Sequence, residues 1–177
     1  VMGLMFQEAE SFNQPIGNWD VSNVTDMEYM FTYATAFNQP IGNWDVSNVT
    51  RMSNMFYSAQ SFNQPIENWD VSSVTNMDFM FSGFIAPQAF NQDISSWDVS
   101  NVINMRAMFS FTDAFNQPIG DWDVSSVTDM AGMFSAAANF NQDLSSWSVD
   151  NVTSCNNFSL DSPLTEENTP NFTNCTP

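Results

Sequence analysis

Five aspartates recur at one position of a repeated motif, and they are the best candidates for chemistry in this chain. Stacked copies of the motif would place neighbouring carboxylates roughly 4.8 Å apart, where they repel by about 1 kcal/mol even in water. Either each Asp accepts hydrogen bonds from the residue two positions on, or the row shares a divalent cation such as Ca²⁺, or a flat partner docks on it. We favour the local bonds, because no calcium-binding loop motif occurs. The row is Asp20, Asp45, Asp70, Asp98 and Asp123.

Catalytic chemistry is poorly supported by the residue types present. The chain has no His and no Lys, so the commonest general bases are missing. Carboxylate pairs such as Asp121 and Asp123 could act as acid and base, but every repeat carries an acid near this position. We therefore expect a protein that is not an enzyme and that needs no cofactor, with Ca²⁺ as the one candidate ion.

The tryptophans reveal the repeat that positions the aspartates. They lie 25 residues apart, except for one interval of 28, at Trp19, Trp44, Trp69, Trp97, Trp122 and Trp147. A fixed period of this length is typical of a solenoid, in which each repeat packs mainly on its neighbours. We expect about six to seven coils, with function on surface rows rather than in one pocket.

Each repeat contains two patterns of apolar residues. Apolar and polar residues alternate over 19–22, which predicts a short half-buried strand. Over 27–34 the apolar residues fall at helical spacing, which predicts a two-turn helix. Threonines directly before this segment suit helix N-caps, at Thr25, Thr50, Thr75, Thr128 and Thr153. The predicted fold is an α/β repeat solenoid with short parallel strands on one side and short helices on the other.

The Phe-Asn-Gln motif and its surroundings complete the predicted organisation. We expect its asparagines, such as Asn38, to turn inward and pair with the backbone of adjacent coils. The repeat region spans 1–158, with a partial first repeat over 1–11 and a three-residue insertion near 83–88. There, Phe84 and Ile85 would form a local apolar bump. Residues 159–177 form an irregular C-terminal cap or tail.

The amino-acid composition indicates which classes of partner this protein does not bind. Twenty acidic residues against two basic ones give a formal net charge of −18. Such a chain is repelled by nucleic acids and by anionic membrane surfaces. It contains no apolar run of the length that spans a bilayer. We therefore expect no nucleic-acid binding and no membrane insertion.

The two cysteines and the glycosylation sequons favour secretion. Cys155 and Cys175 lie 20 positions apart at the C-terminal end, where a disulfide would be worth roughly 3 kcal/mol and would imply an oxidising compartment. A reduced, buried pair is the alternative. Sequons in the irregular tail are the better glycan acceptors, at Asn157, Asn171 and Asn174; the others, at Asn23, Asn48 and Asn151, fall within the repeat motif.

The repeat from Phe12 onward reads Phe-Asn-Gln-Pro-Ile-Gly-Asn-Trp-Asp-Val-Ser-Asn-Val-Thr-Asp-Met, followed by Met-Phe after two further residues. This motif resembles the BspA-like leucine-rich-repeat surface proteins with 25-residue repeats, a group also described as a domain of unknown function. The resemblance covers residues 1 to about 158. It implies a leucine-rich-repeat-like solenoid displayed outside a cell, called an adhesin or surface-structure protein by analogy.

Three functions follow from these observations. The first is an extracellular or cell-surface module, structural or adhesive, that binds protein or glycan; Tyr29, Tyr33 and Tyr57 are candidate contacts. The second is a self-assembling subunit of a sheath, filament or coat, because the half repeat at the start would expose Met2, Met5 and Phe6. The third is an ice-binding surface, which the use of the Thr row as helix caps counts against.

Overall fold

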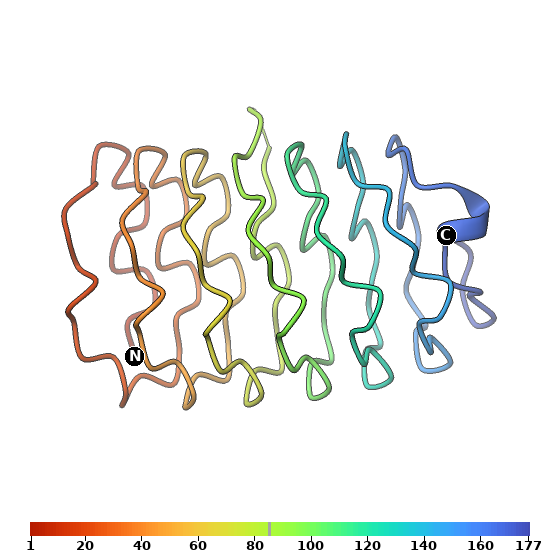
Figure 1. Cartoon of the computed structure of the whole chain (residues 1–177), viewed down its shortest axis with the longest axis horizontal. Helices are drawn as coiled ribbons and strands as arrows, with labels where there is room; N and C mark the ends of the chain where they lie inside the picture. The colour runs from red at the N-terminus through yellow and green to blue at the C-terminus, as the bar shows by residue number, and fades with distance from the viewer. Residues whose placement is uncertain (85) are drawn as a thin grey trace.

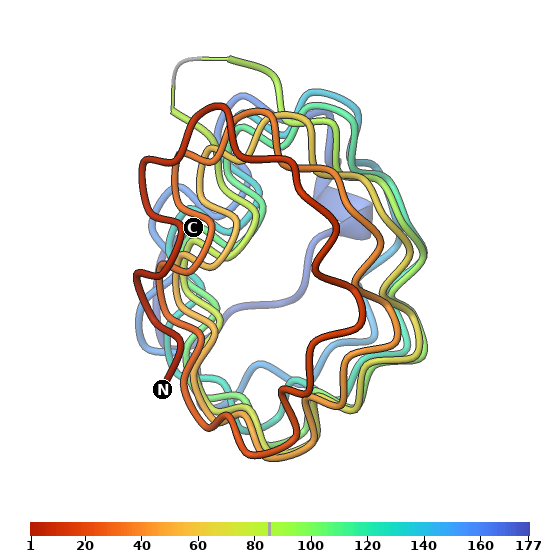
Figure 2. The same cartoon turned by 90° about the vertical axis from the view of Figure 1, so that its left-hand side faces the viewer.

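The computed structural model describes residues 1–84 and 86–177. The chain winds into a row of similar circuits, here called coils, that stack along the long axis (Figure 1). Seen along that axis, the coils nearly superpose around a common interior (Figure 2). Backbone hydrogen bonds join successive coils, as from Met27 N to the Arg51 carbonyl at 3.1 Å. Residues about one repeat apart therefore become neighbours in space.

The predicted α/β solenoid is wrong. In the described part of the chain the one helix is the short 3-10 helix η1, Glu166–Asn168, which lies outside the repeats. Strand pairing there is limited to isolated parallel bridges, one between each pair of adjacent coils. Neither a strand layer nor a helix layer forms. The bridges join Asp26 to Arg51, Arg51 to Asn76, Asn76 to Asn104, Asn104 to Asp129 and Asp129 to Ser154.

The segment expected to be helical forms a series of tight turns. Its N–H groups alternate between two acceptors: some reach the carbonyl three residues back, as Met30 to Met27 at 3.2 Å, and others reach the next coil, as Phe31 to Met55 at 2.9 Å. Tyr29 and Tyr33 adopt positive φ, which breaks a right-handed helix. A two-turn helix is marginal alone, and bonds to the next coil replace it.

The predicted burial of this segment is nevertheless confirmed. Met27, Met30, Phe31 and Ala34 are fully buried, as the helical spacing indicated. The tight turns place the same side chains inward as a helix would. Apolar spacing thus identified the face in contact with the core, but not the backbone path that places it there.

The segment expected to be a strand is also irregular, for a local reason. Its alternation is confirmed in the inner coils, where Trp44 and Val46 are buried while Asp45 between them is exposed, whereas Trp19 of the first such segment is 40% exposed. The Ser47 N–H, which a strand ladder would use, instead donates to the Asp45 side chain at 3.1 Å. The Val49 N–H turns back to the Val46 carbonyl at 2.8 Å. These local bonds compete with sheet formation.

Stacked aromatic rings form the centre of the core. Phe31 and Phe56, equivalent residues of adjacent coils, stack with ring centroids 5.6 Å apart, and Phe56 lies 4.0 Å from Phe62 of its own coil. Tryptophan adds a polar bond, because Trp69 Nε1 donates to the Ile41 carbonyl of the preceding coil at 3.1 Å. The same Trp bond recurs at Trp44, Trp97, Trp122 and Trp147.

The Asn side chains join adjacent coils as predicted. Asn13 Oδ1 accepts from the Asn38 N–H at 2.9 Å, and Asn38 Oδ1 accepts from the Asn63 N–H at 3.0 Å. The bond repeats through Asn91, Asn116 and Asn141. The side chains lie nearer the surface than expected, because several remain exposed. Pairing with neighbouring backbone is confirmed, and full burial is not.

The insertion and the two ends depart from the regular coil. Near the insertion, the described chain on either side of residue 85 stands out beyond the neighbouring coils (Figure 2), and Phe84 is 65% exposed, as the predicted bump requires. Ile85 lies outside the described residues. At the C-terminal end, residues 159–177 cross the last coil, where Phe172 packs edge-on against Phe158 at 5.0 Å.

We predict that Trp69→Ala lowers the free energy of unfolding by about 3 to 5 kcal/mol, as a large core deletion does. Trp69 is buried and stacks between Phe56 and Trp97. Denaturant unfolding measures the loss. Trp69→Phe is the matched control: it retains a stacked ring and loses only the indole bond to the Ile41 carbonyl, which still accepts from the Trp44 N–H, so it should cost only about 0.5 to 1.5 kcal/mol. Equal losses in the two variants would contradict the stacking role.

Candidate functional site

The predicted aspartate row lies on the surface, and each carboxylate is occupied locally. Asp45 Oδ1 accepts from both the N–H of Ser47, at 3.1 Å, and its hydroxyl, at 2.6 Å. The same pair of bonds forms at Asp20, Asp70 and Asp98, and Asp123 accepts from the Ser125 N–H at 3.0 Å. The local arrangement, favoured from the sequence, is confirmed.

Local hydrogen bonds lower the pKa of four aspartates of the row. The Ser47 hydroxyl, followed by its N–H, lowers the pKa of Asp45, although the neighbouring charge of Asp20 acts in the opposite direction. Bonds from the corresponding serines likewise lower the pKa of Asp20, Asp98 and Asp123, and of Asp93 and Asp143 elsewhere in the repeats. At Asp20, Asp45, Asp98 and Asp123 these bonds therefore favour the ionised carboxylate.

No set of three or more His, Cys, Asp or Glu side chains within residues 1–84 and 86–177 is arranged to hold a metal ion. Each Asp of the row directs one oxygen to its own serine rather than to the next coil. Calcium binding by the row stays a prediction.

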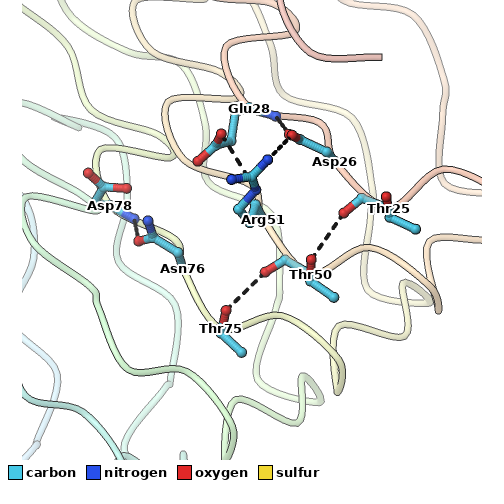
Figure 3. A network of polar contacts seen from close by, with 8 residues as sticks. All are labelled: Thr25, Asp26, Glu28, Thr50, Arg51, Thr75, Asn76 and Asp78. Atoms are coloured by element: carbon cyan, nitrogen blue, oxygen red, sulfur yellow. Dashed lines mark hydrogen bonds and ion pairs between the residues drawn. The ribbon is translucent and has the colours of Figure 1, made fainter. Parts of the chain in front are cut away.

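The threonines do not cap helices, which is a second correction. Thr50 Oγ1 donates to the Thr25 carbonyl at 3.2 Å, and Thr75 Oγ1 donates to the Thr50 carbonyl at 3.3 Å (Figure 3). The Thr side chains therefore join neighbouring coils along an exposed row. Because no helix starts beside them, their N-cap function does not exist. Ile103 interrupts the row and is 49% exposed.

Arg51, one of the two basic residues, lies in an acidic setting. Its guanidinium donates to Asp26, and its Nε lies 3.6 Å from Glu28 Oε2 (Figure 3). Asp26 also accepts from the Glu28 N–H at 2.9 Å. This ion pair joins two coils at one of the bridge positions. Arg51 is thus neutralised locally and is not a free binding group.

Two of the three tyrosines considered as ligand contacts pack on neighbouring aromatic rings. Tyr33 packs edge-on against Tyr57 at 5.4 Å, and Tyr57 packs edge-on against Phe79 at 6.2 Å. Tyr29, in the same coil as Tyr33, is 39% exposed. We call Tyr29, Tyr33, Tyr57 and Phe79 the aromatic strip. It crosses three coils, and its half-buried rings, Tyr33, Tyr57 and Phe79, pack on each other rather than on helices.

The backbone beneath the strip makes its aromatic residues unexpected. Tyr29, Tyr33 and Phe79 have φ of 59°, 58° and 54°, in the left-handed region. An ordinary side chain there costs roughly 1 to 2 kcal/mol per residue, which glycine avoids. At the position of Phe79, the other coils hold Leu4, Tyr29, Asn54, Ala107, Gly132 and Asn157. Stability of the coil does not explain bulky rings at these positions.

A small hollow adjoins the strip. It holds about 180 Å³ and is lined by Phe79, Arg106 and small residues that include Ala107, Ala131 and Gly132. Unlike Arg51, Arg106 makes no ion pair with any described residue. The hollow therefore combines an aromatic ring, a cation and little side-chain bulk. It suits a single protruding group rather than a whole ligand, because sites for complete small molecules are about 300 to 1,000 Å³.

The predicted disulfide is present. Cys155, in the last coil, is bonded to Cys175 in the tail. The tail is also held by a backbone bond from the Leu144 N–H to the Asn168 carbonyl at 2.9 Å. A disulfide indicates an environment outside the cytoplasm. Within the described residues no helix has the length and apolar character that crossing a bilayer requires.

All six predicted sequon asparagines are exposed, but their amides differ. Those of Asn48, Asn151 and Asn174 donate to backbone carbonyls at 2.8, 2.8 and 2.6 Å. Asn23 makes a long bond of 3.5 Å to the Ser22 hydroxyl. Asn157 has positive φ, and Asn171 lies in the tail. Glycan attachment stays a prediction for each of them.

Sequence reasoning missed Phe79 and Arg106 as surface groups. Phe79 falls within the segment predicted to be helical, and no sequence signal marked its left-handed backbone. The one available signal was comparison between repeats: Asn54, Gly132 and Asn157 at the equivalent position are residues that tolerate positive φ, although Leu4, Tyr29 and Ala107 also occupy it.

Comparison with known proteins gives a family and no activity. A family model described as "Mycoplasma protein of unknown function, DUF285" matches residues 1–88 and again residues 82–172. The chain belongs to this family. Neither a curated protein nor a solved structure matches it. The two DUF285 segments overlap at the insertion, and the second extends into the disulfide-bonded tail.

We predict that Ser47→Ala raises the pKa of Asp45, because the variant removes the hydroxyl and retains the backbone N–H. A titration followed by carboxyl NMR shifts measures it. Ser73→Ala is the control and should leave Asp45 unchanged. An unchanged pKa in Ser47→Ala would contradict the assignment. Because folding lowers the pKa of these groups, they stabilise the protein above about pH 3.9, the unfolded Asp value. That stability is lost as pH falls through the lower folded values.

Cys175→Ser should release the tail before any repeat unfolds. The loop closed by the disulfide spans a separation of 20 residues, and its loss costs roughly 3 kcal/mol. Limited proteolysis with mass spectrometry should find the first cuts within 159–177. First cuts near the N-terminus, at the same rate as in the unaltered protein, would show that the disulfide does not hold this end.

Proposed function

We propose that this protein is an extracellular adhesive module of the BspA-like type, which binds a protein partner through the aromatic strip and the adjoining hollow. The observation that carries the proposal is the placement of Tyr29, Tyr33 and Phe79 at left-handed backbone positions. A left-handed backbone disfavours side chains of this kind, and their rings lie outside the core. A binding role gives a reason for them. The disulfide supports an environment outside the cytoplasm.

The chemistry of this surface favours a protein partner. Tyr and Arg are enriched among residues that dominate binding energy in protein interfaces. Arg106, without an ion pair among the described residues, lies at the hollow beside Phe79. A single partner side chain fits a hollow of about 180 Å³. The net charge of −18 favours a partner with a basic surface.

Self-assembly into a sheath, filament or coat is the second candidate. Exposed apolar residues elsewhere on the coils favour it, namely Leu4, Phe84 and Phe111 at 58%, 65% and 44% exposure. Copies that each carry −18 repel one another at low salt. Light scattering over a dilution series distinguishes the two. Growth in mass with concentration and salt favours assembly, and a constant monomer mass favours the adhesive module.

A selection from a displayed peptide library tests the strip even while the natural partner is unidentified. The triple variant Tyr33→Ser, Tyr57→Ser and Phe79→Asn introduces residues that other coils hold at the same positions, namely Ser58, Ser82 and Asn54. We expect it to fold and to bind the selected peptides at least about tenfold more weakly, because interface aromatics are frequent hot spots. The recovered peptides should be basic and apolar.

The matched control replaces Asn18, Asn43 and Asn68 with Ser, the residue that later repeats hold at Ser96 and Ser146. These residues lie in the segment before the tryptophans, away from the strip in the sequence. The control should bind the selected peptides as the unaltered protein does. Equal binding by the strip variant and the unaltered protein, with both folded by circular dichroism and melting temperature, refutes the proposal.

A further inference from the structure

A second surface of the repeats contains an uncharged trough. It holds about 560 Å³, within the range of about 300 to 1,000 Å³ that ligand sites occupy. It is lined mainly by hydroxyl and amide side chains from adjacent coils, with one apolar residue. We call it the neutral trough; its principal residues are Ser73, Thr75, Asn101, Ile103, Ser126 and Thr128.

The trough results from differences between repeats. Two rows run along this surface, one of Asn or Ser and the other of Thr, because the residues on either side of each inward Val point outward. Most coils hold Asn in the first row, such as Asn48 and Asn101. Ser73 and Ser126 are shorter and flank Asn101 on both sides. The depression forms because these serines lack the amide group that Asn carries. Beside it, Ile103 replaces the Thr of the second row.

Bonds between coils hold the lining in place. Asn101 Nδ2 donates to the Ser72 carbonyl at 2.9 Å, and Thr128 Oγ1 donates to the Ile103 carbonyl at 3.3 Å. Thr75 Oγ1 is held in the same way by the Thr50 carbonyl. The Ser73 and Ser126 hydroxyls make no hydrogen bond to any described residue. The trough thus has fixed walls and two free hydroxyls, an arrangement that lowers the entropy cost of binding.

The charges in and around the neutral trough limit the class of ligand that it can bind. The lining carries no ionisable side chain, and Asp98 and Asp123 of the aspartate row lie three residues before Asn101 and Ser126. An anionic polymer is repelled by these carboxylates. A ligand rich in uncharged hydroxyls can exchange hydrogen bonds with Ser and Asn, and can rest a C–H face on Ile103, which is 49% exposed.

From these contacts we infer that the neutral trough binds a segment of an uncharged polysaccharide, aligned across the coils. The inference rests on the proposed extracellular role and adds a second ligand at a surface separate from the aromatic strip. An ordered water lattice shares the hydroxyl chemistry, and the Thr row is not engaged in helix capping. Ice is therefore the competing occupant, and the experiment includes it.

Cellohexaose, mannohexaose and chitohexaose are suitable probes, with hexagalacturonate as the charged counterpart. The full chain, made in an oxidising bacterial host that adds no N-glycans, is titrated with each at millimolar concentration. Binding is followed by calorimetry and by amide NMR shifts. We expect at least one neutral hexamer to bind, with shifts at Ser73, Ile103 and Ser126, and hexagalacturonate not to bind. The inference is overturned if none of the neutral hexamers binds. It is also overturned if the protein shows thermal hysteresis, which indicates ice binding, instead of hexamer binding.

The test variant combines Ser73→Asn and Ser126→Asn, which introduce the side chain that four other coils hold and so fill the trough without foreign residues. Affinity should fall at least about tenfold, with the melting temperature unchanged. The matched control is the reverse change outside the trough, Asn23→Ser, which should bind normally. If the filled variant binds the hexamer as tightly as the unaltered protein does, the trough is not the binding site.

The two proposals fail separately. If the strip variant loses peptide binding and no hexamer binds the protein, the adhesive module is supported and the polysaccharide site in the trough is refuted. If a hexamer binds the unaltered protein but not the filled variant, and the strip substitutions do not change peptide binding, the trough is supported as a ligand site and the aromatic strip is refuted.

Discussion

The hydrogen bonds between adjacent coils are the constraint on which the rest of the structure depends. In each repeat the segment around Met27 to Tyr33 gives alternate N–H groups to the next coil and the others to carbonyls three residues back. Many backbone N–H groups of this segment are thereby paired without a helix or a sheet. The alternation requires a left-handed backbone at fixed positions, which explains the positive φ of Tyr29, Tyr33 and their equivalents. It also places identical residues of successive repeats directly beside each other.

That alignment determines what each side chain contributes. Inward columns stack ring on ring, as Phe31, Phe56 and Phe81 do. Polar columns form ladders, in which one side chain pairs with the next coil's backbone. Charged columns are the difficult case, because like charges meet at every coil. The aspartate row counters this repulsion with hydrogen bonds to serines of the same coil. Arg51 instead forms ion pairs with acidic residues of the neighbouring coil.

Differences between repeats then become the informative features of the surface. A regular column gives a uniform face, whereas one altered residue produces a local shape. Ser73 and Ser126 open the neutral trough beside Asn101, and small residues beside Phe79 and Arg106 open the hollow. Membership of the DUF285 family fixes no ligand. In this chain the candidate sites lie where the copies differ, on walls that the ladders hold in place.

The sequence by itself determined the repeat, the inward faces, the Asn ladder, the local bonds of Asp45 and the disulfide between Cys155 and Cys175. Each depends on spacing or on residues near in sequence, and is readable without the fold. Strands and helices were wrongly predicted, because burial of Met27, Met30 and Phe31 suits both a helix and a run of turns. Only the tertiary structure decides between them, since the choice lies between an acceptor three residues back and one in the next coil. For the same reason it alone brings Tyr57 to Phe79 and opens the trough beside Asn101: such contacts depend on residues a full repeat apart.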